Sequence, residues 1–137
     1  MSISVSATVL TGLIAWTLLL LVLMEVLRVR LVAVKAVPSN GFQPDNGNLS
    51  PFMQRLARAH ANCLEGLPVF GGLLVVAIIT GRAGVTDPLA PWLLAARVAQ
   101  TSIHLASLSV IAVNLRFTAF VVQTVIGVVW AWRLLAG

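Results

Sequence analysis

One stretch of the sequence decides the fold: Arg55-Leu-Ala-Arg58-Ala-His-Ala-Asn62-Cys-Leu-Glu65-Gly-Leu-Pro-Val-Phe70. Its polar side chains at Arg55, Arg58, Asn62 and Glu65, here called the polar stripe, are three or four residues apart, and an apolar run follows them. At about 100° per residue they fall within about 80° on one helix face. An ionisable group at the centre of a bilayer costs about 2.5–3.5 kcal/mol. The stripe must therefore face protein or water, which makes it the first candidate site.

The composition indicates an integral membrane protein. The 137 residues are 59% hydrophobic and only 9% charged, whereas a soluble domain carries about 25% charged residues. A water-facing surface cannot be built from so few polar residues. We therefore predict one transmembrane domain over residues 1–137 and an all-α fold.

Four apolar segments are predicted to span the membrane, at about 5–27, 55–80, 89–113 and 117–135. Each is close to the length of about 20 residues that a helix needs to cross hydrocarbon. None alternates in the way of a barrel strand. The first segment lacks the basic start and the cleavage site of a signal peptide, so we expect it to be retained. The prediction is a bundle of four transmembrane helices.

The net charge of +5 reflects membrane topology and does not indicate nucleic-acid binding. Basic residues gather between the first two segments or at their ends, at Arg28, Arg30, Lys35, Arg55 and Arg58. By the positive-inside rule this first loop faces the cytoplasm and both termini lie on the other side. In a bacterial cell, this would be the inner membrane.

Local signals predict the helix ends. Ser50 and Pro51 are typical of an N-cap and a first helical residue. Pro68 has no amide hydrogen and should bend the second helix. A tight turn is expected at 114–116, so that Arg116 opens the last helix.

Arg28 allows two interpretations. It follows Glu25 by three residues, which suits an ion pair at the membrane interface. Alternatively, Arg28 or Arg30 lies at the mouth of a ligand site.

The arginines expected at the cytoplasmic end indicate an anionic ligand. Arg55, Arg58, Arg97 and Arg116 would face one another with a single acid, Glu65. So much unpaired positive charge is unfavourable at low dielectric. Arginine forks suit carboxylates, Glu65 could take an ammonium and Asn62 an amide. Glutathione is a small peptide with these groups, and an arginine near its sulfur would favour the thiolate. No metal site is predicted, because the two histidines and four acids do not cluster at ligand spacing.

Three segments carry a family resemblance. Residues 58–70 resemble the helix 2 signature of the MAPEG family (membrane-associated proteins in eicosanoid and glutathione metabolism), and residues 97–104 and 116–120 are similar to its helix 3 segment and helix 4 entry. The likeness is to a bacterial-type member related to microsomal glutathione transferase and prostaglandin E synthase. It covers nearly the whole chain.

The resemblance implies a homotrimer of four-helix protomers, with glutathione bound between subunits and the site open to cytoplasm and lipid. It implies that glutathione is bound by Arg55, Arg58, Asn62, Glu65, Arg97 and His104. Arg28 and Arg30 are further candidates at the mouth, and Arg116 would stabilise the thiolate. The implied activity is conjugation or reduction of lipophilic electrophiles from the bilayer, by a glutathione transferase or peroxidase.

The sequence also departs from the family. It has no tyrosine, whereas family members often have one where His104 stands and another near Gln100. Phe117 replaces a serine of one prostaglandin-synthesising branch, which argues against that activity. Two alternatives therefore stay open: a non-catalytic lipid-binding or scaffold protein of the same fold, and a polar stripe that only joins helices.

Overall fold

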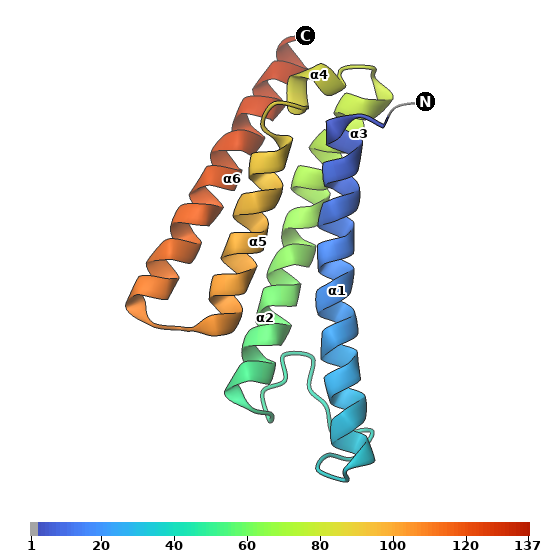
Figure 1. The fold of residues 1–137 in the computed structure, drawn as a ribbon, viewed down its shortest axis with the longest axis vertical. Helices are drawn as coiled ribbons and strands as arrows, with labels where there is room; N and C mark the ends of the chain where they lie inside the picture. The colour runs from blue at the N-terminus through green and yellow to red at the C-terminus, as the bar shows by residue number, and fades with distance from the viewer. Residues whose placement is uncertain (1–2) are drawn as a thin grey trace.

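The computed structural model describes residues 3–137, which are helical apart from the loop at 34–50 and short connections, and contain no strand in that range (Figure 1). The all-α prediction is confirmed. The elements are α1 (Val5–Ala33), α2 (Pro51–Gly66), the π-helical segment η1 (Leu67–Gly71), α3 (Gly72–Ile79), α4 (Ala83–Thr86), α5 (Ala90–Ala106) and α6 (Val110–Ala136).

The helices form an elongated bundle. α2, η1 and α3 follow one another as one rod, and α1, α5 and α6 lie beside it, with α1 starting and α6 ending at the same end of the molecule (Figure 1). α5 packs most extensively against α6 and also contacts α1 and α2. This central place of α5 brings its side chains within reach of the other three.

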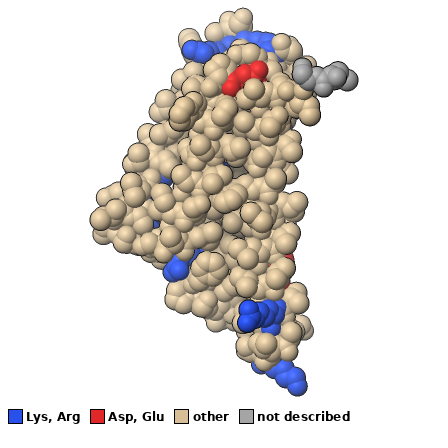
Figure 2. Space-filling view, in the orientation of Figure 1, with Lys and Arg blue, Asp and Glu red and all other residues tan. Residues whose placement is uncertain are grey.

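Among the residues that the structure describes, three helical stretches are long and apolar enough to cross a membrane: Val5–Ala33, Pro51–Ile79 and Val110–Ala136. α5, with 17 residues, is shorter than the segment predicted at 89–113. On the face seen in Figure 2, Lys, Arg, Asp and Glu gather toward the two ends and few lie between. A middle region with few charged groups on this face suits the hydrocarbon layer of a bilayer.

The prediction that Arg116 opens the last helix is wrong. α5 ends at Ala106, and α6 begins at Val110, where the Ser109 hydroxyl accepts a hydrogen bond from the amide of Ala112 at 3.2 Å. This serine cap starts the helix before the expected turn at 114–116. Arg116 consequently lies almost two turns inside α6, beyond the first turn in which the helix dipole acts.

For the rod of α2, η1 and α3, local chemistry predicted the start of the helix and a bend at Pro68. Ser50 caps α2 by accepting a hydrogen bond from the Met53 amide at 3.3 Å, and Pro51 is the first helical residue, which confirms that prediction. At Pro68, where the amide hydrogen is missing, the rod becomes π-helical over Leu67–Gly71.

The loop from 34 to 50 is fixed by one buried asparagine. Asn46 Oδ1 accepts hydrogen bonds from Arg28 Nε at 3.1 Å and Nη2 at 2.6 Å, and Asn46 Nδ2 donates to the carbonyl of Met53 at 2.7 Å. Arg28 also pairs with Glu25 at 3.2 Å, which confirms the predicted ion pair between these two residues. Arg28 therefore ties the end of α1 to the loop and to α2.

We expect Asn46→Ala to lower the free energy of unfolding by about 1–3 kcal/mol, because it leaves buried polar groups unpaired. Asn46 is 0% exposed and has a positive φ of 56°, which alanine tolerates less well. The control is Asn48→Ala, which removes one exposed hydrogen bond to Gly41 in the same loop. Denaturant unfolding in detergent micelles measures both. Equal stability of the two variants would contradict this role.

Candidate functional site

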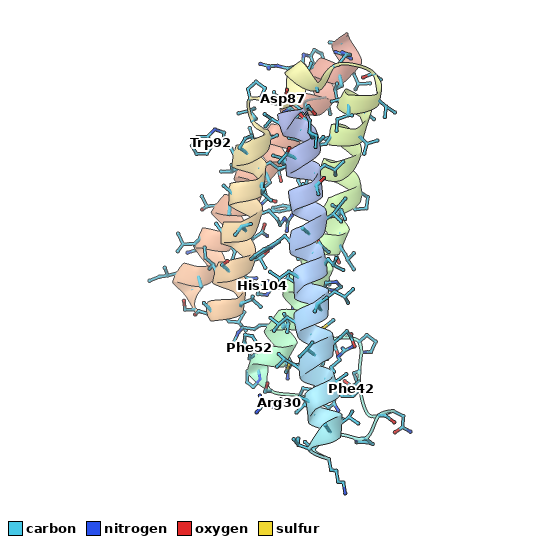
Figure 3. The ribbon with its side chains drawn as sticks, turned by 45° about the vertical axis from the view of Figure 1, so that its right-hand side comes forward. Arg30, Phe42, Phe52, Asp87, Trp92 and His104 are labelled. Atoms are coloured by element: carbon cyan, nitrogen blue, oxygen red, sulfur yellow. The ribbon has the colours of Figure 1, made fainter. Side chains whose placement is uncertain are left out.

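A polar cavity of about 480 Å³ brings together side chains from three helices. It is lined by Arg58, Ala61, Asn62, Glu65, His104, Leu108 and Arg116. Three residues of the polar stripe thus meet one residue of α5 and one of α6, as the sequence predicts. Figure 3 shows His104 in the lower half of the molecule, toward the end at which α2 begins.

The charged groups of this cavity are free to bind. Within residues 3–137, the side chains of Arg58 and Glu65 form no hydrogen bond or ion pair, and both are exposed. Arg116 Nε is buried and has no hydrogen-bond partner in the same range. Two guanidinium groups facing one carboxylate leave an excess of positive charge, which suits an anionic ligand.

Arg97 is held by a residue of the cavity. It is only 4% exposed, and its Nη1 donates a hydrogen bond to Asn62 Oδ1 at 2.6 Å. It does not line the polar cavity itself. Through this hydrogen bond, Arg97 holds the side chain of Asn62 in one orientation.

A glycine makes this contact possible. A Cβ atom at Gly66 would lie 2.7 Å from Arg97 Nη2, which is closer than real Cβ contacts allow. The guanidinium of Arg97 therefore lies against α2 in the space left by the missing side chain of Gly66, and a Cβ atom at this position would require Arg97 to move.

Three predicted site residues lie away from the polar cavity of their own chain. Arg55 Nε donates to the Leu105 carbonyl at 3.0 Å, near the end of α5. Arg28 holds Asn46, and Arg30 is exposed near the end of α1 (Figure 3). Their part in ligand binding stays a prediction.

An apolar groove adjoins the polar cavity. It has a volume of about 820 Å³, runs between the α2–η1–α3 rod and α6, and shares Asn62 and Glu65 with the cavity. Its other lining residues are mostly apolar and include Val69, Phe120 and Val128. A charged ligand and a lipophilic molecule could therefore meet at this boundary.

The sequence analysis assigned no role to Gln123, although hydrogen bonds connect its side chain through Gln100 to Asn62 of the cavity. Gln123 is fully buried in α6, and its Nε2 donates to Gln100 Oε1 at 2.8 Å. Gln100 in turn reaches Asn62. The available signal was a lone glutamine within the apolar segment 117–135, since polar side chains within membrane segments usually face other helices.

The chain was compared with known proteins. Residues 6–136 match the family model described as MAPEG family. Neither the comparison with curated proteins nor that with solved structures gave a match. The family match covers almost the full length of the chain and agrees with the resemblance in the sequence.

Gly66→Ala should destabilise the protein relative to Gly72→Ala, by about 1–3 kcal/mol, because the new methyl group displaces a buried arginine from its partner. Gly72 is the matched control: it lies six residues further along the same rod, and a Cβ atom there meets nothing within 4 Å. Thermal unfolding in micelles compares the two. Equal melting temperatures would show that Arg97 does not depend on this space.

Proposed function

The chain belongs to the MAPEG family of integral membrane proteins, and on that premise we propose that it is a glutathione-dependent transferase or peroxidase acting on lipophilic electrophiles. The observation that carries the proposal is the polar cavity. It combines Arg58, Arg116, Asn62 and Glu65 next to an apolar groove.

The groups of the cavity suit one carboxylate, the ammonium group, an amide and the sulfur of glutathione. Arginine donates parallel hydrogen bonds to a carboxylate, which suits Arg58 to one of the two carboxylates. Glu65 is the acidic residue of the cavity and suits the ammonium group. Asn62 supplies an amide for the peptide part of the ligand. The remaining positive group, Arg116, is then available to the sulfur.

Arg116 is proposed to stabilise the thiolate. A thiol has a pKa of about 8.5 and is mostly protonated at neutral pH. A guanidinium in a partly shielded site favours the anion. The thiol proton leaves to solvent, and the sulfur attacks the electrophile, so that a carbon–sulfur bond forms as the leaving group departs. In peroxidase action, the thiolate attacks one oxygen of a hydroperoxide and the O–O bond breaks. The sulfur keeps this oxygen as a sulfenic acid, and a proton from solvent completes the departing alcohol. A second glutathione then reduces the sulfenic acid, which gives glutathione disulfide and water.

Assembly and topology belong to the same proposal. We take α5 as the fourth membrane-crossing helix, with the loop between α1 and α2 in the cytoplasm, and the protomer as part of a homotrimer. Exposed Arg58 and Glu65 at the edge of the cavity support this, since charged groups at this depth need cover from protein or water. A neighbouring copy would supply it.

The apolar groove favours a second candidate function, that of a non-catalytic lipid-binding protein. Its volume of about 820 Å³ and its apolar lining suit an acyl chain without any chemistry. Glutathione binding separates the two functions. Purified protein that retains lipid and does not bind glutathione would favour the second.

Arg58→Ala and Glu65→Ala should each weaken glutathione binding by about 2–5 kcal/mol if the charge pair is desolvated. Titration calorimetry on the detergent-solubilised protein measures the affinity. Arg133→Ala is the control, because it removes an exposed arginine near the end of α6 that lines no part of the cavity. Parental affinity in both cavity variants would assign the stripe to structure alone.

Arg116→Ala should lower kcat by about 10²–10³-fold if the loss resembles that of an oxyanion donor. Glutathione binding should change much less. Thiolate absorbance and turnover of an aryl halide at saturating glutathione measure the two effects. Arg133→Ala again controls for the loss of one charge. A variant that forms thiolate and turns over like the parent would exclude Arg116 as the stabilising group.

A further inference from the structure

We infer that Gln123 is a positioning residue that acts through Gln100 on Asn62, so that Asn62 presents an N–H donor, and not its carbonyl oxygen, to the ligand. The inference rests on the proposed function for the nature of the ligand. The relay itself rests on four side chains from α2, α5 and α6.

At each end of the relay, the orientation of the amide is determined by a partner that can only donate or can only accept a hydrogen bond. Arg97 can only donate, so the Asn62 atom at 2.6 Å from its Nη1 must be the oxygen. The carbonyl of Ala119 can only accept, so the Gln123 atom at 3.1 Å from it must be the nitrogen. Neither amide can be turned over without losing its partner.

The middle of the relay follows from its ends. Gln123 Nε2 lies 2.8 Å from Gln100, which must therefore offer its oxygen. The nitrogen of Gln100 is then directed to the other side, where it lies 3.4 Å from Asn62 Oδ1. Gln100 thus adds a second donor to the oxygen that Arg97 already contacts.

One polar group of the Asn62 side chain, its amide N–H, remains available to a ligand. Its oxygen receives both donors, whereas its Nδ2 forms no hydrogen bond within residues 3–137. Asn62 lines both the polar cavity and the apolar groove. The ligand atom at this point must accordingly be an acceptor, such as a carbonyl or carboxylate oxygen, and the ammonium is left to Glu65.

Burial makes the arrangement costly to reverse. Gln123, Gln100 and Arg97 are 0%, 7% and 4% exposed. A reversed Asn62 would set its N–H group against donors of Arg97 and Gln100, with little water to satisfy either. The relay therefore selects one orientation before the ligand arrives, which reduces the ordering cost of binding.

Asn62→Asp tests the donor directly. The carboxylate keeps an oxygen for Arg97 but replaces the N–H donor by a second acceptor. We expect the Kd for glutathione to rise about tenfold or more, since one hydrogen bond of this kind is lost and an acceptor faces an acceptor. Parental affinity of Asn62→Asp would show that Asn62 presents its oxygen, and would overturn the inference.

Gln123→Leu tests the positioning role. Gln123 Oε1 is buried without a hydrogen-bond partner in the described range, so leucine also removes an unsatisfied group and the variant should fold. We expect Kd to rise about fivefold to twentyfold, with kcat at saturation within about threefold of the parent. Thr118→Val, an exposed polar-to-apolar change on α6, should match the parent.

A double-mutant cycle separates positioning from a general loss of structure. In the Asn62→Asp background, Gln123→Leu should raise Kd less than about twofold, because no donor remains to be oriented. Independent, additive effects of the two substitutions on Kd would overturn the positioning role.

The relay can also be tested without ligand, by the free energies of unfolding of the Gln100→Leu and Gln123→Leu variants, alone and combined. Additive changes in these free energies would overturn the relay. If the parent does not bind glutathione but the stabilities are coupled, the proposed function fails and the relay stands.

Discussion

The hydrogen bond between Arg97 and Asn62 is the interaction on which the arrangement of the site depends. It lies between two apolar clusters of the bundle, one around Leu74 and Trp130 and the other around Leu20 and Leu56. A buried guanidinium at this depth is costly unless its donors are used. The missing side chain of Gly66 admits it, and Asn62 accepts its hydrogen bond. The orientation of Asn62 in the site thus follows from the one hydrogen bond by which it accepts from the buried Arg97.

Two groups can be distinguished among the arginines of the chain, those hydrogen-bonded within the chain and those that line the cavity. Arg97 and Arg28 are occupied within the chain, by Asn62 and by Asn46. Arg58 and Arg116 line the cavity, and neither donates a hydrogen bond there to the residues that the structure describes. The occupied Arg97, which holds Asn62, lies next to the open Arg58 and Arg116, and this arrangement reduces the binding energy spent on ordering the protein.

Local chemistry accounts for what could be predicted from the sequence. Ser50 and Pro51 determine the start of α2 by capping, and periodicity alone puts Arg58, Asn62 and Glu65 on one face. The position of Arg116 was mispredicted because Ser109 competes as a cap with the expected turn at 114–116. The role of Gly66 could not be predicted, since it depends on how closely Arg97 of α5 approaches α2, which no spacing within one helix encodes. For Gln123, its place in an apolar segment indicates only that the side chain faces another helix, and its partner Gln100 is known from the structure alone.

The most direct measurement of the central claim is a structure of the membrane-embedded protein with glutathione, by electron cryomicroscopy in nanodiscs. We expect density for the peptide in the polar cavity, with a carboxylate at Arg58, the ammonium at Glu65, an acceptor at Asn62 Nδ2 and the sulfur nearest to Arg116. Density in the apolar groove alone, or a polar cavity without the peptide at saturating glutathione, would contradict it.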